Sequence, residues 1–200
     1  MSDQHPVHKL GILTSGGDAP GMNAALRAAV RTALEQGVEA IAIREGYRGL
    51  VEGGNAFRPM DWDAAGGIMH QGGTIIGTAR CEEFRTREGR LRAAQNLVDH
   101  GIDRLIVMGG DGSLTAADLL HREWPELVSE LVEAGRIDGA VGLACADDRM
   151  QLRVDVAVSA EGMVVSETPA ATRIGREVLA DGTRQHQVGR PAQHPRADRR

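Results

Sequence analysis

Two glycine-rich turns contain the residues of this sequence that are best suited to chemistry. Their residues are Gly16 and Gly17 in TSGGDAPG, and Gly110, Asp111, Gly112 and Ser113 in MGGDGS. Each turn follows an apolar run and precedes an amphipathic one, so we expect each at the end of a strand and the start of a helix. Free backbone N–H groups and the helix dipole favour phosphate at such a point, and glycine lets oxygen atoms approach the backbone closely.

The same turns also fit structural roles that need no ligand. Neither turn has the spacing of a Walker A loop or of G-x-G-x-x-G, so neither of those mechanisms is indicated. One such turn fits tight packing of a strand on a helix as well as it fits a ligand, whereas two equivalent turns favour a ligand. Asp111 has the chemistry to hold Mg²⁺ against phosphate oxygens, but an Asx turn or a helix N-cap would use the same residue.

Strand and helix signals alternate up to about residue 143. Apolar runs predict strands at residues 8–14, 38–43 and 139–143, and in the run DRLIVM that begins at residue 103. Helical periodicity predicts helices at 22–37 and 86–101, a candidate helix at 62–69, one helix after GGDGS, and a separate helix at 124–137 with Pro125 near its start. Residues 44–54 are predicted to form a loop. This order predicts an α/β fold with a doubly wound, mostly parallel sheet.

Composition excludes several classes of protein. The chain of 200 residues has a net charge of -5 and no basic stripe in its apolar-patterned part, so a nucleic-acid partner is not indicated. Cys81 and Cys145 lack metal-ligand spacing, which argues against a zinc site or a disulfide framework. No secretory h-region or long apolar run is present, so we expect a cytoplasmic protein that does not span a membrane.

Three segments together resemble one enzyme family. They are GILTSGGDAPGMNAA, GGTIIGTARCEEFRTREGR and VMGGDGSLTAADLL. In this order they resemble the nucleotide-site segments of ATP-dependent 6-phosphofructokinase. Their residues are more similar to those of the eukaryotic type. The similarity covers residues 8–143 and implies an incomplete N-terminal, ATP-binding domain. Kinases of the NAD kinase and diacylglycerol kinase type share only the GGDG turn.

The resemblance implies a role for each candidate residue. Gly16 and Gly17 would lie along the ATP phosphates, Arg80 and Cys81 would line the nucleotide site, and residues 110–113 would hold the nucleotide, with Asp111 on Mg²⁺. Pyrophosphate-dependent relatives carry Asp at the position of Gly112, so this glycine points to ATP as the phosphate donor. Without the resemblance, Arg80 would be a solvated surface charge and Cys81 a small buried apolar residue.

Two arginines outside these turns also match the family. Arg27 and Arg31 resemble positions that contact an effector in bacterial relatives. A pair at this spacing is equally typical of a solvated helix face.

The acceptor half of the reaction is missing from the pattern. The family places its catalytic base in a T-I-D-N-D or S-I-D-N-D segment after the strand expected at 139–143, and here the sequence continues ACADDRMQLRVDVAV. Asp147 and Asp148 lack the flanking residues of that segment, so we assign no catalytic residue. Residues 1–7 are expected to be disordered, and 144–200 to form an unmatched, irregular tail. A shifted reading frame or mispredicted splice near codon 144 and true divergence are competing hypotheses for this change.

Two function classes follow from these observations. The first is a 6-phosphofructokinase that uses ATP and fructose 6-phosphate in glycolysis, in a family that is usually tetrameric. The second is a catalytically silent nucleotide-binding fragment that lacks the base and the sugar-phosphate site. We expect a sheet interrupted at this point to be of marginal stability, because it would expose an apolar edge.

Overall fold

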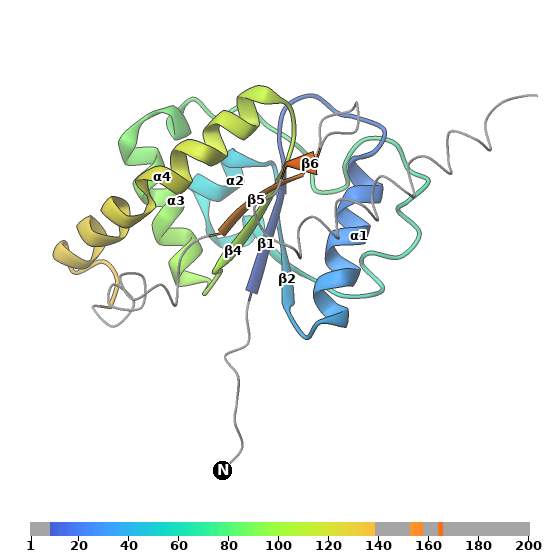
Figure 1. Cartoon of the computed structure of the whole chain (residues 1–200), viewed down its shortest axis with the longest axis horizontal. Coiled ribbons are helices and arrows are strands. Elements are labelled where there is room, and N and C mark those ends of the chain that lie inside the picture. The colour runs from blue at the N-terminus through green and yellow to red at the C-terminus, as the bar shows by residue number, and fades with distance from the viewer. Residues whose placement is uncertain (1–8, 139–152, 158–163, 166–200) are drawn as a thin grey trace, which may run out of the picture.

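The fold is organised around one mixed sheet. The computed structural model describes residues 9–138 and the strand residues 153–157 and 164–165. The six strands lie in the order β3-β2-β1-β4-β5-β6 (Figure 1). They are β1 (Lys9–Thr14), β2 (Glu39–Ile43), β3 (Phe57–Met60), β4 (Arg104–Met108), β5 (Arg153–Ala157) and β6 (Val164–Val165). The pairs β2-β1, β1-β4 and β4-β5 are parallel, and the outermost strands β3 and β6 pair antiparallel with their neighbours.

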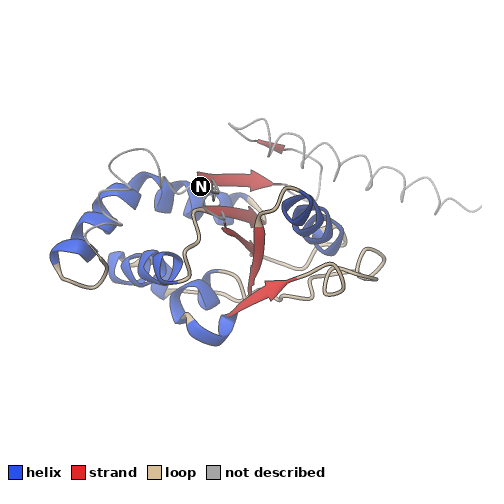
Figure 2. Ribbon diagram, turned by 90° about the horizontal axis from the view of Figure 1, so that it is seen from below, coloured by secondary structure: helices blue, strands red, loops and turns tan. Residues whose placement is uncertain are grey.

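Helices cover both faces of this sheet. They are α1 (Met22–Glu35), α2 (Tyr47–Glu52), α3 (Arg87–Asp99) and α4 (Asp111–Glu133), with the short 3-10 helices η1 (Gly54–Ala56) and η2 (Glu83–Arg85). Seen along the sheet, the strands lie between α1 and the group α2, α3 and α4 (Figure 2). The prediction of a doubly wound, mostly parallel α/β sheet is therefore confirmed.

Alternation along the strands explains the two-sided core. In β1, Ile12 faces a cluster formed with α1, whereas Leu13 faces a second cluster formed with α2, α3 and α4. Both side chains are fully buried. Because successive side chains in a strand point to opposite faces, continuous apolar strands need a helical layer on each side.

Two expected helices differ from the structure. Residues 62–67 form turns instead of the candidate helix at 62–69, and Gly67 within them has a φ of 63°. The helices expected on either side of Trp124 are one helix, α4, with Pro125 inside it. Pro125 removes one backbone donor, but Trp124, Leu127 and Leu131 are buried in the core, and this packing holds the helix together across the proline.

The segment after β2 contains structure that periodicity did not predict. Residues 44–54 were expected to be a loop, but they contain α2, a helix of six residues that buries Tyr47 and Leu50. A six-residue helix is too short to produce a clear period, so its signal was missed. The antiparallel strand β3 was missed as well, because Pro59 argues against a strand except at a sheet edge, where β3 lies.

Two strands fall in the segment that was expected to be irregular. Strand β5 pairs with β4 in a register that aligns Val154 with Leu105 and Val156 with Val107. Neither β5 nor β6 was predicted within residues 144–200. The expected strand at 139–143, the pair Asp147 and Asp148, and residues 1–7 lie outside the described residues.

Candidate nucleotide-binding site

The two glycine turns lie side by side at the carboxyl ends of β1 and β4. The first follows β1 and the second follows β4, and these strands are parallel neighbours, with Thr14 aligned with Met108. From β1 the chain continues to β2 on one side, while β4 lies on the other side, so the strand order reverses between β1 and β4. Ligands of open α/β sheets bind beyond the carboxyl ends of the strands at such a switch point.

Direct hydrogen bonds join the turns. The Ser15 amide donates to the Met108 carbonyl at 2.8 Å, and the Ser113 hydroxyl donates to the Ser15 hydroxyl at 2.9 Å. Gly109 lies between them, and a Cβ there would be 2.5 Å from the Ser15 carbonyl oxygen and 2.7 Å from the Ser113 Oγ. Only glycine fits this position. Ser15 and Gly109 were not named from the sequence, because their contacts join segments that lie far apart along the chain and that a local pattern cannot relate.

The glycines predicted to bind phosphate are of two kinds. Gly16 has a φ of 92°, a conformation that favours glycine for the fold alone. Gly17, Gly110 and Gly112 do not have a positive φ, and a Cβ at any of them would meet no atom within 4 Å. All four are exposed. The packing of the described chain therefore does not require glycine at the last three positions. At each of them, backbone without a side chain faces open space.

The amino end of α4 has no side-chain cap. Gly110 is the N-cap residue, and the amides of Ser113 and Leu114 donate to its carbonyl at 2.9 and 3.1 Å. Asp111 is the first residue of the helix, not its N-cap, and its side chain is exposed. The N-cap interpretation of Asp111 is thus wrong. The carboxylate of Asp111 lies in the first turn of α4, where the helix dipole favours a negative charge.

At this point the described residues do not by themselves supply a full set of metal ligands. The described part of the chain has no group of three or more His, Cys, Asp or Glu side chains that could hold a metal ion. Mg²⁺ suits such a site, because it is commonly bound by one or two carboxylates together with substrate phosphates and water. The exposed Asp111 fits this type of coordination.

A third glycine-rich segment is fixed beside the turns. The hydroxyls of Thr14 and Thr74 are hydrogen-bonded at 2.9 Å, and Thr14 also donates to the Gly77 carbonyl at 3.0 Å. Asn23 at the start of α1 accepts from the Ile75 amide at 2.8 Å and donates to the Gln71 carbonyl at 3.0 Å. The segment 71–77 is therefore anchored to the end of β1 and to the first turn of α1.

Arg80 and Cys81 follow this anchored segment and lead into η2. Arg80 is exposed, whereas Cys81 is half-buried and packs against the cluster on the α2, α3 and α4 face. Cys81 is a free thiol. The hydroxyl of Tyr47 donates to the Ser113 carbonyl at 2.6 Å, and its ring lies 4.3 Å from that of Phe84 in η2. Tyr47 thus connects η2 with the first turn of α4, a link that the sequence did not predict.

The arginine pair on α1 is only partly exposed. The Arg31 guanidinium lies over the ring of Trp62 at 4.9 Å from its centre. This cation–π contact shows that Arg31 is not a freely solvated charge.

Together, these features define an α/β domain whose candidate ligand site is the switch point between β1 and β4. The phosphofructokinase family profile matches residues 9–146. The chain belongs to the phosphofructokinase family, and the resemblance inferred from the sequence is confirmed.

Fungal relatives give the most detailed comparison. The chain is 58% identical over 134 residues to ATP-dependent 6-phosphofructokinase 2 of Aspergillus oryzae, covering 67% of this chain and 17% of the relative. It is 59% identical over 129 residues to ATP-dependent 6-phosphofructokinase of Yarrowia lipolytica, covering 64% of this chain and 14% of the relative. The chain therefore spans about a sixth of the length of these curated relatives.

Solved structures agree with this assignment. The phosphofructokinase from Saccharomyces cerevisiae superposes with a TM-score of 0.71 at 50% identity, over 76% of this chain and 20% of that one. Pichia pastoris phosphofructokinase in the T-state superposes with a TM-score of 0.66 at 43% identity, over 79% of this chain and 17% of that one. Among the described residues, no helix combines the length and the apolar character needed to cross a membrane.

Proposed function

We propose that this chain forms the ATP-binding part of an ATP-dependent 6-phosphofructokinase, which transfers phosphate from ATP to fructose 6-phosphate. The observation that carries the proposal is the junction of two exposed glycine turns at the ends of β1 and β4, linked by Ser113 and Ser15. The names of the fungal relatives support ATP as the donor and a hexose phosphate as the acceptor. The expected setting is cytoplasmic glycolysis, in a family that is usually tetrameric.

The proposed roles follow from charge and geometry. Backbone amides at Gly16, Gly17 and residues 110–112 would hold the phosphate oxygens. Ser113, whose own amide is bonded to the Gly110 carbonyl, would complete the turn that holds the nucleotide. Asp111 would hold Mg²⁺, which neutralises charge on the phosphates when it is bound. Arg80 would offset charge on the transferred group, and Cys81 would line the nucleotide site.

Binding and turnover are separate parts of this proposal. The family match ends at residue 146, and the described residues supply no candidate for the base that takes the proton from the sugar hydroxyl. The second candidate function is therefore a nucleotide-binding chain without turnover. Both functions require the same ATP site, and they differ in whether fructose 1,6-bisphosphate is formed.

Calorimetric titration with Mg-ATP tests the binding site. Asp111→Ala and Gly112→Asp should each weaken binding by about tenfold or more, because one removes the cation ligand and the other places a carboxylate near the phosphates. A Cβ at Gly112 meets no atom, so the second variant should fold normally. Asp118→Ala is the matched control, because Asp118 is an exposed carboxylate on the same helix beyond its first turn. Equal affinity in all four proteins would overturn the proposal.

A coupled assay for fructose 1,6-bisphosphate separates the two functions. Turnover by the chain, abolished in Asp111→Ala, would establish the kinase function for this sequence. Mg-ATP binding that depends on Asp111 without any product would establish the silent nucleotide-binding function instead.

A further inference from the structure

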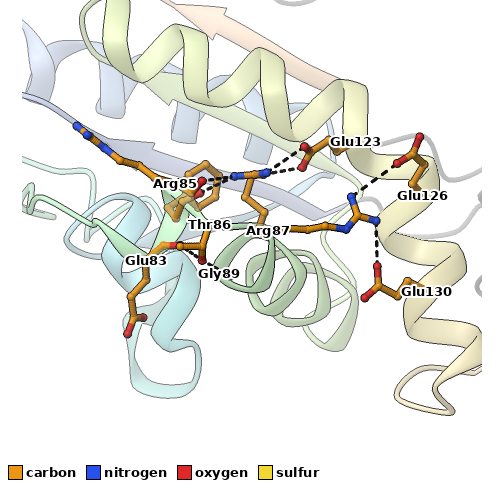
Figure 3. A network of polar contacts seen from close by, with 10 residues as sticks. Glu83, Arg85, Thr86, Arg87, Gly89, Glu123, Glu126 and Glu130 are labelled. Atoms are coloured by element: carbon orange, nitrogen blue, oxygen red, sulfur yellow. Dashed lines mark hydrogen bonds and ion pairs between the residues drawn. The ribbon is translucent and has the colours of Figure 1, made fainter.

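Arg90 is a buried charge whose hydrogen bonds all point to neighbouring segments. Its side chain on α3 is 8% exposed. It donates to both carboxylate oxygens of Glu123 on α4, from Nε at 2.5 Å and from Nη2 at 2.9 Å. Its Nη1 donates to the carbonyls of Phe84 at 3.2 Å and Arg85 at 2.7 Å (Figure 3). A buried guanidinium needs such complete pairing, because its charge has left water.

The carbonyls that Arg90 binds belong to η2. This turn begins at Glu83, two residues after Cys81, so its position limits where Arg80 and Cys81 can lie. Two other features hold η2 close to α3. The Thr86 hydroxyl donates to the Glu83 carbonyl at 2.7 Å. Gly89 of α3 lies so near that same carbonyl oxygen that a Cβ at this position would overlap it. The chain that follows Arg80 and Cys81 is therefore held against α3 by η2.

Arg87 forms ion pairs between the same two helices, but these do not extend to η2. Arg87 pairs with Glu126 at 3.6 Å and with Glu130 at 2.9 Å, as Figure 3 also shows. Its side chain is 46% exposed, and these contacts run only from α3 to α4. Exposed pairs of this kind contribute little, whereas the Arg90 pair is buried and extends to η2. The difference between the two arginines is the basis of a controlled comparison.

We propose that Arg90, held by Glu123, is a positioning residue of the nucleotide site. Through the Phe84 and Arg85 carbonyls it fixes η2, and so sets Arg80 and Cys81 relative to the turn at residues 110–113. The turn at residues 110–113 leads into α4, and Glu123 lies on the same helix. The Arg90–Glu123 pair therefore links the position of η2 to the position of that turn. The part of this inference that concerns ATP rests on the proposed function.

The thiol of Cys81 reports the position of this segment without any nucleotide. In a Cys145→Ser background, the rate of Cys81 alkylation by a maleimide should rise by about tenfold in Arg90→Met, because the segment opens more often. Arg87→Met is the control and should stay within about twofold of the parent. An unchanged rate in Arg90→Met, or an equal rise in Arg87→Met, would overturn the inference. Glu123→Gln keeps an acceptor for Arg90 and gives a milder rise if Arg90→Met does not fold.

Titration with Mg-ATP then tests the link to Arg80. Arg90→Met should weaken Mg-ATP binding about fivefold or more in the parent, and much less in an Arg80→Ala background, because the lost positioning acts through Arg80. Equal losses in both backgrounds would mean that Arg90 has only a general structural role, and would overturn the inference. If the parent binds no Mg-ATP, the proposed function fails, while faster Cys81 alkylation in Arg90→Met alone would still support the hold of Arg90 on η2.

Discussion

Ser113 and Ser15 are hydrogen-bonded through their hydroxyls at 2.9 Å, although 98 residues separate them. Ser113 lies in the first turn of α4, and Ser15 is the first residue after β1. Both side chains are buried, at 8% and 7% exposure. This bond joins the two glycine turns, so the position of one turn is linked to the position of the other.

Ser15→Ala should weaken this junction without enlarging the core. The Ser113 hydroxyl would lose its acceptor in a buried place, at a cost of about 1–3 kcal/mol in the free energy of unfolding. The double variant with Ser113→Ala should cost less than the sum of the single variants, because both partners are then gone. Urea unfolding of the four proteins measures this coupling, and simple additivity would show that the bond does not join the turns.

Gly16→Ala and Gly17→Ala should affect different properties. Gly16 has a φ of 92°, so alanine there should lower the free energy of unfolding by about 1 kcal/mol or more. Gly17 does not have a positive φ and has open space around its Cβ position, so alanine there should leave stability within about 0.5 kcal/mol. Gly17→Ala should instead weaken Mg-ATP binding by blocking approach to the backbone. Thermal unfolding and titration of both variants distinguish the two roles, and a Gly16→Ala variant as stable as the parent would contradict the first.

The elements that position the glycine turns could be predicted because their signals are local. The apolar runs of β1, β2 and β4 and the periodicity of α1 and α3 each lie within one segment, and glycine marks the turns between them. The glycine turns themselves were found for the same reason. Once these elements were placed in a parallel sheet, the meeting of the two turns followed from strand direction.

The parts that could not be predicted depend on contacts between distant segments. Pro125 indicated a helix start, but burial of Trp124 and Leu127 on either side keeps α4 continuous. Arg90 was part of a helical pattern and showed no sign of pairing with Glu123, 33 residues away. The role of Tyr47 was likewise hidden, because its partner Ser113 lies 66 residues further along the chain.

Tyr47→Phe should remove an alkaline sensitivity of the fold. Burial raises the pKa of Tyr47 above its ordinary value, so the folded chain keeps this proton where the unfolded chain loses it. Stability from this residue is therefore complete below about pH 10 and falls as the pH rises further. Tyr47 is the one tyrosine of the chain, so tyrosinate absorbance should appear only on unfolding. Absorbance that rises near pH 10 while the circular dichroism stays native would contradict this.

The same substitution tests the contact with Ser113 at neutral pH. Without the hydroxyl, the Ser113 carbonyl loses a donor at 2.6 Å, which should lower the free energy of unfolding by about 1 kcal/mol. The ring contact with Phe84 is kept in this variant, so η2 should stay in place. Cys81 alkylation at the parent rate is the expected result.

Glu123→Gln should change how the free energy of unfolding depends on pH in acid. The hydrogen bond from Arg90 lowers the pKa of Glu123, although burial opposes it. Stability from this carboxylate is thus present above the unfolded pKa of about 4.3 and is lost as the pH falls through the lower folded value. The advantage of the parent over Glu123→Gln should be constant near pH 7 and shrink below about pH 4. An advantage that does not change with pH would mean that the charge of Glu123 is not what stabilises the pair.

Strand β5 should be needed to keep the sheet from self-association. It covers the outer edge of β4, whose Leu105, Ile106 and Val107 form part of the buried core. A chain ending at residue 138 would leave the backbone groups of that edge unpaired and open to another molecule. A chain ending at residue 165 keeps β5 and β6 and is the matched control. Size-exclusion chromatography with light scattering should show larger species for the shorter chain alone, and two equally monodisperse chains would place the edge of the stable sheet at β4.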